Sequence, residues 1–216
     1  MNLINEKKIF SFFSETKKGV EELTKNEIKN TTSYNEKRLN DFATGRFCAK
    51  KAIEISGISS IDLLIGLEGK PIWPIDLVGS ISHSESLTGA IIASQSDFIS
   101  LGLDIEEIGN VTSDLWDYLF TETEKKFLRG FEDPKKQMEQ STILFSMKES
   151  FYKLQNPVTN TFLDFLEVEL KCTSGRYYLN LLHPINLHER LNSETEVFVK
   201  KYDNIIITFC YWHNTH

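Results

Sequence analysis

Residues 98–106, FISLGLDIE, alternate between two faces in the way a β-strand does. The odd-numbered positions are all aliphatic: Ile99, Leu101, Leu103 and Ile105. The even-numbered positions end in two acids, Asp104 and Glu106. Because side chains two apart on a strand point the same way, these carboxylates lie side by side and repel each other. Two interpretations follow: a solvated polar face, or a pair of carboxylates that awaits a cation.

Length and charge limit what surrounds this strand. The chain has 216 residues, of which 40% are hydrophobic and 25% charged, enough for one large or two small globular domains. Its net charge of -7 argues against a protein held on nucleic acid by backbone phosphates, although an acidic average can hide a basic pocket. Cys48, Cys172 and Cys210 lack metal-ligand or paired spacing, which predicts reduced thiols. No segment reads as a signal peptide or a membrane span, so we expect a soluble, cytoplasmic protein.

The first half of the chain reads as one helix followed by strands. A helix is predicted at about residues 35–56, ended by Gly57. The Gly and Pro residues of GLEGKPIWP mark a turn. GSISHS and LTGAIIAS then read as a strand pair that leads into residues 98–106. We therefore expect one helix on an antiparallel sheet.

The second half repeats this plan. Short helical pieces around DLWDYLF and TETEKKFLRGF precede a break at Asp133-Pro134 and a long helix at about residues 135–155. FLEVELKC, RYYLNLL and TEVFVKKYDNIIITFCYW read as strands, the last as a hairpin turning at Asp203-Asn204. The prediction is an α+β fold of two similar lobes, residues 1–105 and 106–216, each a long helix packed on a small, mainly antiparallel sheet. We expect the active site at their junction, where clefts tend to form.

Charged residues break the apolar stripe of both predicted helices. In the first helix, Arg46 falls inside the stripe, and Arg38 and Lys50 flank it. A buried guanidinium needs an anion, which is either an acid of the chain or a ligand phosphate. In the second helix, Glu149 and Lys153 share the face opposite the stripe, as in an ordinary solvated ion pair. Lys148 lies on the apolar flank of that helix.

His83 lies at the end of a predicted strand, in SISHS. A lone histidine of this kind is more often a core or surface group than a ligand.

Five motifs in order then resemble one family. GSISHS, LGLDIEEI and FSMKESFYK, together with the upstream DFATGRFCAKKAI and GKPIWP, resemble the 4'-phosphopantetheinyl transferases. They are most similar to the larger, two-lobed branch that activates siderophore and peptide-antibiotic synthetases. The resemblance covers residues 38–153, and the remaining segments carry no motif that matches. It implies an enzyme that transfers the 4'-phosphopantetheine group of coenzyme A to a serine of an apo peptidyl or acyl carrier protein, releasing adenosine 3',5'-bisphosphate.

The resemblance also implies the site residues. The predicted magnesium ligands are Asp104, Glu106 and Glu149, and hard oxygen ligands of this kind suit that ion. The predicted contacts to coenzyme A are Arg38, Arg46, Lys50, Lys70, Ser82, His83, Lys148 and Lys153. Relatives often have arginine at the position of Lys50, so the bidentate fork is lost there.

Three residues are assigned to the chemistry by the same resemblance. Lys153 would stabilise or protonate the departing phosphate. Glu149 is the first choice for the base that takes the serine proton, directly or through a water, and Glu124 in FTETE is the second.

Two other functions stay open at this point. One is a different magnesium-dependent phosphoryl-transfer or phosphodiester-cleaving enzyme that acts on coenzyme A or nucleotides. The other is a noncatalytic module that binds coenzyme A or a carrier protein. We expect a monomer, whereas the pathway, whether fatty-acid, polyketide or peptide synthesis, is left undecided. Five aromatic residues could form either a carrier-docking surface or core: Phe12, Phe13, Trp116, Phe120 and Phe127.

Overall fold

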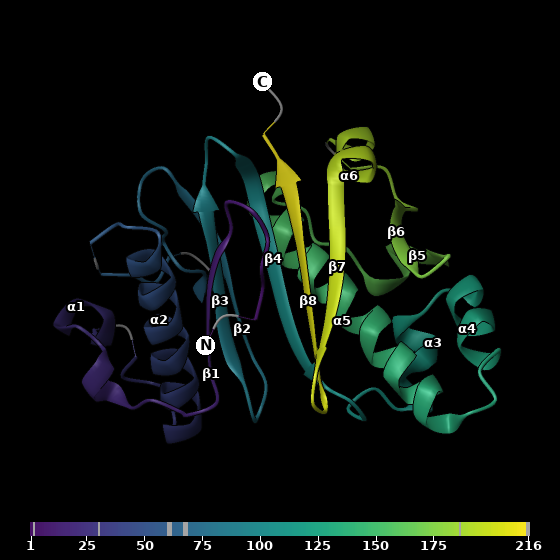
Figure 1. Cartoon of the computed structure of the whole chain (residues 1–216), viewed down its shortest axis with the longest axis horizontal. Helices are drawn as coiled ribbons and strands as arrows, with labels where there is room; N and C mark the ends of the chain where they lie inside the picture. Colours follow the sequence, from purple (N-terminus) through teal and green to yellow (C-terminus); the bar gives the residue numbers. More distant parts are fainter. Residues whose placement is uncertain (2, 30, 60–61, 67–68, 186, 215–216) are drawn as a thin grey trace. The chain divides into compact units, whose positions relative to one another are not determined.

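The computed structural model describes residues 1, 3–29, 31–59, 62–66, 69–185 and 187–214 and confirms the mixed α+β class (Figure 1). The chain forms two compact units. Unit 1 comprises Met1–Leu101 with the last residues from Asn214, and unit 2 comprises Gly102–His213. The division lies inside strand β4 (Phe98–Glu107), and the boundary predicted from the sequence falls slightly later in the same strand.

Unit 1 packs one long helix on a three-stranded antiparallel sheet. The sheet has the order β1-β3-β2, formed by β1 (Phe10–Ser14), β2 (Leu77–His83) and β3 (Thr88–Ser94). The strand pair predicted from GSISHS and LTGAIIAS is therefore confirmed, while β1 was missed because it is only a short segment. Helix α2 (Glu36–Ile55) lies against β1 and β3, and η1 (Val20–Glu22) and α1 (Lys25–Ile28) precede it.

The ends of α2 follow from its sequence. Asn35 is the N-cap, and its side chain accepts a hydrogen bond from the backbone N–H of Arg38. Gly57 follows the last turn with a φ of 88°, a conformation that side chains disfavour. Ala52 and Ile53 of α2 are fully buried in one cluster with Leu77 and Ile92 of the sheet.

Unit 2 contains two small sheets. The larger has the order β4-β8-β7, with β7 (Thr195–Tyr202) and β8 (Ile205–His213), and the smaller pairs β5 (Val168–Thr173) with β6 (Arg176–Leu181). The predicted hairpin at Asp203-Asn204 is confirmed, since Tyr202 pairs with Ile205. One expectation is wrong: β4 does not extend the β2–β3 pair but hydrogen-bonds to β8, far away in sequence (Figure 1). Strand periodicity carries no information about such a distant partner.

Helix α5 (Pro134–Thr159) covers the larger sheet of unit 2 by packing on β7 and β8 and closing onto β4. A Cβ placed on Gly102 would lie 1.8 Å from the carbonyl oxygen of Ser150 and 2.9 Å from Cys210 Sγ. Close by, the hydroxyls of Ser146 and Thr208 are 2.8 Å apart. The glycine in LGLDIEEI therefore lets the helix backbone touch the strand that carries the two acids.

The long helix of unit 2 begins as predicted but ends later than predicted. Asp133 caps its start and Pro134 is its first residue. The prediction ended it near residue 155, yet the helix passes through Pro157 to Thr159. Pro157 lies in the last turn, where it disturbs few backbone hydrogen bonds, and Asn160 closes the helix with a left-handed φ of 51°.

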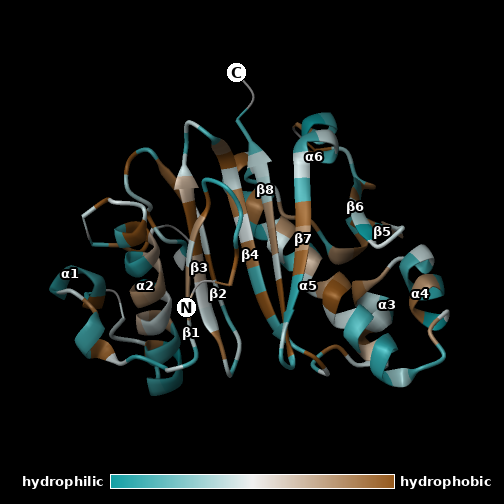
Figure 2. Cartoon of the chain, viewed as in Figure 1, coloured by the Kyte–Doolittle hydropathy of each residue, from teal (hydrophilic) through white to brown (hydrophobic). Residues whose placement is uncertain are grey.

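Shorter elements complete unit 2: η3 (Ser113–Leu115), α3 (Trp116–Leu119), α4 (Glu122–Arg129), η4 (Phe165–Glu167) and α6 (His188–Glu194). Figure 2 shows hydrophobic turns on α5, whereas α1 is mostly hydrophilic. The three cysteines are free thiols. Within the described part of the chain, no helix has the length and apolar character needed to cross a membrane.

Candidate functional site

The acidic face of β4 is not solvated at Asp104. That residue is 3% exposed, and Glu106 is half-buried. The same face packs against α5 at Gly102, and Asp104 Oδ1 accepts a hydrogen bond from Lys153 Nζ at 2.6 Å. The interpretation as a solvated face is therefore wrong for Asp104, and Lys153 is more than a member of a surface ion pair on α5.

The acids on β4 and α5 influence one another. Burial, and then the charge of Asp104, raise the pKa of Glu106 to about 7, and Glu149 adds to this shift. Burial also raises the pKa of Glu149, where Lys153 opposes and Asp104 reinforces the effect. Negative charge is thus crowded among Asp104, Glu106 and Glu149, a situation that a cation relieves.

These three carboxylates are near enough to interact but are not arranged as a ready metal site. Across the described residues, no group of three or more His, Cys, Asp or Glu side chains could hold a metal ion. The cation on Asp104 is the ammonium of Lys153. The chemistry of the donors nevertheless suits magnesium, since all three are carboxylates and the ion prefers oxygen ligands.

Lys148 and Glu124 form an ion pair inside unit 2. Their side chains are 2% and 0% exposed, and Lys148 Nζ lies 2.7 Å from Glu124 Oε2. Lys148 also donates to the carbonyls of Leu119 and Phe165, both at 2.8 Å. Burial lowers the pKa of Lys148 and raises that of Glu124, and the attraction between the two opposes both shifts. Lys148, which was assigned to coenzyme A binding, and Glu124, the second choice for the base, are therefore bound to each other inside the chain.

Arg46 is the buried cation that the first helix predicted. It is 4% exposed, its Nε donates to the carbonyl of Leu63 at 2.8 Å, and its guanidinium lies 4.4 Å from the centre of the Phe42 ring. Burial lowers its pKa to about 10, although the charge of Glu27 opposes the shift. Arg46 Nη2 has no hydrogen-bond acceptor among the described residues. A buried donor of this kind is rare in proteins and indicates a partner from outside the described residues.

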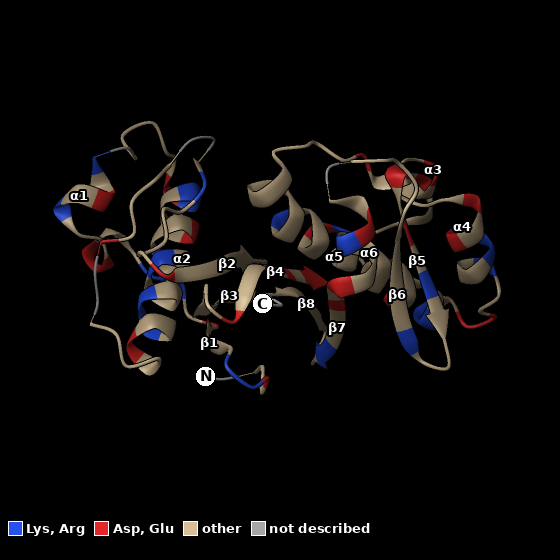
Figure 3. Cartoon of the chain, turned by 90° about the horizontal axis from the view of Figure 1, so that it is seen from above, with Lys and Arg blue, Asp and Glu red and all other residues tan. Residues whose placement is uncertain are grey.

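Arg46 belongs to a row of alternating cations and aromatic rings on α2. The Arg38 guanidinium lies 4.5 Å from the centre of the Tyr34 ring, and Tyr34 meets Phe42 edge to face at 5.7 Å. Figure 3 shows lysines and arginines at several turns of α2. Tyr34 was missed from the sequence, although the spacing of four between Arg38, Phe42 and Arg46 places these residues on one helix face.

The other predicted coenzyme A contacts lie in unit 1 with mixed surroundings. Lys50 Nζ donates to the carbonyl of Glu22 at 2.7 Å and to Glu27 Oε2 at 3.2 Å. Ser82 is buried and Lys70 is half-buried, whereas His83 is exposed, with its Nδ1 4.0 Å from Asp41 Oδ2.

Lys17, which the sequence did not single out, is the close partner of that aspartate. It donates to Asp41 Oδ1 at 2.8 Å and to the carbonyl of Ser84 at 2.9 Å. No local pattern marked Lys17, because its partners come from α2 and from the end of the β2 strand. The structure thus places Lys17 beside Asp41 and Ser84, two residues near His83.

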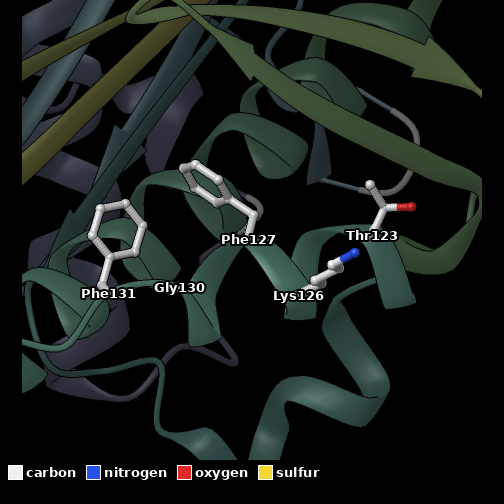
Figure 4. A pocket seen from close by; sticks show the side chains of 5 residues that line it. All are labelled: Thr123, Lys126, Phe127, Gly130 and Phe131. Atoms are coloured by element: carbon white, nitrogen blue, oxygen red, sulfur yellow. The ribbon is translucent and has the colours of Figure 1, made fainter.

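A hollow of about 500 Å³ lies along α4, and none of the predicted acids is among its lining residues (Figure 4). Its lining combines two aromatic rings with small and polar residues: Thr123, Lys126, Phe127, Gly130 and Phe131. Of the five aromatic candidates for docking, Phe13, Trp116 and Phe120 are buried in the core. The core interpretation is therefore correct for these three.

Comparison with known families matches both halves of the chain. Residues 27–93 match the model of the 4'-phosphopantetheinyl transferase N-terminal domain. Residues 100–210, more than half of the chain, match the model of the 4'-phosphopantetheinyl transferase superfamily. The chain belongs to this superfamily. The family resemblance inferred from the five motifs is thereby confirmed, and all three acids lie in the matched residues of β4 and α5.

Two of three similar curated proteins carry the same family name. The chain is 36% identical over 150 residues to the 4'-phosphopantetheinyl transferase Svp of Streptomyces mobaraensis, which covers 68% of the chain and 61% of Svp. It is 30% identical over 135 residues to Npt of Nocardia iowensis, covering 62% of the chain and 60% of Npt. It is 32% identical over 136 residues to enterobactin synthase component D of Escherichia coli K12, covering 60% of the chain and 61% of that protein. The matches span about three fifths of these relatives.

Two solved structures of holo-acyl-carrier-protein synthases align with about half of the chain. A holo-(acyl-carrier-protein) synthase from Bacillus anthracis in complex with CoA (3',5'-ADP) aligns with a TM-score of 0.44 and 16% identity. The alignment covers 55% of this chain and 99% of that one. The Thermotoga maritima holo-[acyl-carrier-protein] synthase aligns with a TM-score of 0.44 and 18% identity, over 55% of this chain and 65% of that one.

Proposed function

We propose that this chain transfers the 4'-phosphopantetheine group of coenzyme A to a serine hydroxyl of an apo carrier protein. The carrier is a peptidyl or acyl carrier protein, and the second product is adenosine 3',5'-bisphosphate. The observation that carries the proposal is the group of interacting charges on β4 and α5. Burial and the charge of Asp104 raise the pKa of Glu106 and of Glu149, and Lys153 Nζ donates to Asp104. All three acids lie in the segment that matches the superfamily.

Asp104, Glu106 and Glu149 would hold magnesium. When bound, the ion would supply positive charge to the pyrophosphate oxygens of the donor and so favour phosphoryl transfer. The fit rests on the chemistry of the donors, three carboxylates of which Asp104 is buried and Glu106 has a pKa of about 7. Without a cation, placing these groups together is unfavourable.

The remaining chemistry falls to α5. The serine oxygen forms a bond to the phosphorus of the pantetheine phosphate, and the bond from that phosphorus to the oxygen of the bisphosphate leaving group breaks. Glu149 takes the proton of the serine hydroxyl. Lys153, which neutralises Asp104 in the structure, would instead stabilise the charge that develops on the leaving phosphate.

Unit 1 would bind the donor through its cations. Arg46 offers a buried N–H group that no described residue accepts, and a phosphate oxygen is the strongest acceptor available to it. Arg38 is exposed on the same face of α2 and would contact a second phosphate oxygen. Coenzyme A carries a pyrophosphate and a 3'-phosphate, so that it provides acceptors for both guanidinium groups.

Intact-protein mass spectrometry tests the proposal directly. One apo peptidyl carrier and one apo fatty-acid acyl carrier are incubated with the protein, coenzyme A and magnesium. We expect a mass gain of one phosphopantetheine group on at least one carrier, and no gain in the presence of a chelator. Coenzyme A cleaved without carrier modification would instead favour a phosphodiester-cleaving enzyme. Coenzyme A that stays intact, but binds in a metal-independent way, would favour a noncatalytic module.

A further inference from the structure

Among the described residues, a capping box opens one short α-helix in each unit. In α1, Thr24 Oγ1 accepts from the backbone N–H of Glu27, whose carboxylate accepts from the N–H of Thr24 at 2.9 Å. In α4, Thr121 and Glu124 make the same two contacts, the second at 2.8 Å. The glutamate of such a box can remain in water, but here both glutamates are buried. Two buried carboxylates in matching positions require a common explanation.

Each glutamate is paired with a lysine from the long helix of its unit. Lys50 of α2 lies 3.2 Å from Glu27 Oε2, and Lys148 of α5 lies 2.7 Å from Glu124 Oε2. The oxygen that bonds the lysine is in both cases the one that bonds the threonine N–H. The same carboxylate oxygen therefore receives one backbone donor and one ammonium in each unit.

The second carboxylate oxygen repeats the pattern. Glu27 Oε1 accepts from the backbone N–H of Leu63 at 2.9 Å, and Glu124 Oε1 accepts from that of Leu170 at 2.8 Å. Each glutamate thus joins three segments, namely its own short helix, the long helix and a further stretch of backbone. Because both oxygens are occupied and an ammonium neutralises them, Glu124 is poorly suited to take a proton from a substrate.

The two lysines also donate their hydrogen bonds to acceptors of the chain itself. Lys148 has three acceptors, Glu124 Oε2 and the carbonyls of Leu119 and Phe165, so that its three N–H groups are all used. A phosphate contact would require one of these buried bonds to break, which is costly in the interior. Lys50 has two acceptors and retains slight exposure.

Each pair is connected to a residue of the proposed reaction, Glu27 through Leu63 to Arg46 and Lys148 as the neighbour in sequence of Glu149. The backbone N–H of Leu63 donates to Glu27, and the carbonyl of the same residue accepts from Arg46 Nε at 2.8 Å. Glu27 therefore holds the residue whose carbonyl orients Arg46. Lys148 directly precedes Glu149 and ties that turn of α5 to the backbone near α3 and η4.

We propose that Glu27–Lys50 and Glu124–Lys148 are equivalent positioning pairs. They hold the long helix of each unit so that Arg46 and Glu149 are presented correctly, and neither pair binds the donor or transfers the serine proton. The inference rests on the proposed function only for the roles of Arg46 and Glu149. It replaces the roles that the family resemblance gave to Lys50, Lys148 and Glu124.

A double-mutant cycle tests the pair in unit 2. Glu124→Gln, Lys148→Met and the double variant are compared in thermal melting, in kcat and KM for coenzyme A, and in the pH profile of kcat/KM. Each single variant leaves a buried polar partner unmatched, so we expect the melting temperature to fall on the order of 10 °C. The double variant should recover part of that loss, and Glu124→Gln should keep both limbs of the pH profile.

The exposed pair of Lys51 and Glu54 on α2 provides the matched control. Its ammonium and carboxylate lie 2.7 Å apart, with side chains 41% and 40% exposed. Lys51→Met with Glu54→Gln should therefore change the melting temperature by no more than about 1 °C.

Two results would overturn the positioning role. One is a Lys148→Met variant that melts like the parent but has a KM for coenzyme A raised about tenfold or more, and the other is a Glu124→Gln variant that loses one limb of the pH profile at normal stability. Failure of the proposed function is a separate outcome, because it would appear as a parent protein that modifies no carrier. The melting temperatures of the variants measure the stabilisation by the pair whether or not the parent is active.

Discussion

The two units anchor their long helices in the same way but place opposite charges beside the anchor. In unit 1, the helix that carries Lys50 presents Arg38 and Arg46. In unit 2, the helix that carries Lys148 presents Glu149 toward the acids of β4. If the pairs are positioning pairs, as we propose, they serve the scaffold, and the residues around each pair decide whether a unit attracts phosphate or cation.

The units also differ in which element supplies the glycine at the contact between helix and sheet. In unit 1 the small residue is Gly45 on the helix, where an added Cβ would lie 2.9 Å from Ile81 Cγ2. In unit 2 it is Gly102 on the strand, where an added Cβ would lie 1.8 Å from the Ser150 backbone oxygen. A side-chain methyl group can move, but the backbone of a long helix cannot move alone.

The largest effect is therefore expected for Gly102→Ala. We predict a loss of about 3 kcal/mol or more of unfolding free energy, because α5 must separate from β4. Gly45→Ala should change stability by about 1 kcal/mol or less, since alanine favours the helix and Ile81 can adjust. Urea unfolding followed by circular dichroism measures both. Equal losses for the two variants would contradict the difference drawn between the units.

The next effect concerns the charge that each helix presents. Glu149→Gln should lower turnover about 100-fold or more, because it removes both a metal ligand and the proposed base. Its melting temperature should stay near that of the parent, since the half-buried carboxylate is crowded by other acids. The measurement is carrier modification by mass spectrometry with saturating coenzyme A. Unimpaired turnover would remove Glu149 from the mechanism.

Arg46→Lys is the matching change in unit 1. Lysine keeps the charge but loses the planar guanidinium that bonds Leu63 and stacks on Phe42. We expect the Kd of coenzyme A, measured by calorimetry, to rise about tenfold while kcat changes less. A variant that loses turnover but binds coenzyme A like the parent would place Arg46 in catalysis instead.

The two anchors should also differ in strength. Lys148 has three acceptors and Lys50 has two, and the pair in unit 2 is shorter. Lys50→Met is therefore expected to lower the melting temperature by roughly half as much as Lys148→Met, about 5 °C against about 10 °C. The reverse order in a thermal melt would show that the number of hydrogen bonds does not set the contribution.

The smallest effect is expected from the aromatic row of unit 1. Phe42→Leu removes the ring under Arg46 and should raise the Kd of coenzyme A about threefold. Phe42→Tyr keeps a ring and should restore binding. A loss of the same size in both variants would indicate that size at this position matters, not the ring face.

Much of the fold followed from the sequence. The period of α2, its start near residue 35 and its end at Gly57 are local features, so residues close in sequence were sufficient to predict them. The hairpin at Asp203-Asn204 and the pair of β2 and β3 were predicted for the same reason. The pairing of β4 with β8 was not, because alternation states which face is buried but not which strand lies beside it.

The sequence by itself determined the family, the two acids on one face of β4 and the long helices that carry the other charges. Only the tertiary structure decided the partner of each charge. Lys153 meets Asp104 across 49 residues and Lys148 meets Glu124 across 24, while Arg46 keeps an N–H group that no described residue accepts. The physical reason is that burial and ion pairing depend on segments that packing brings together from distant parts of the sequence. Local periodicity carries no information about these distant neighbours.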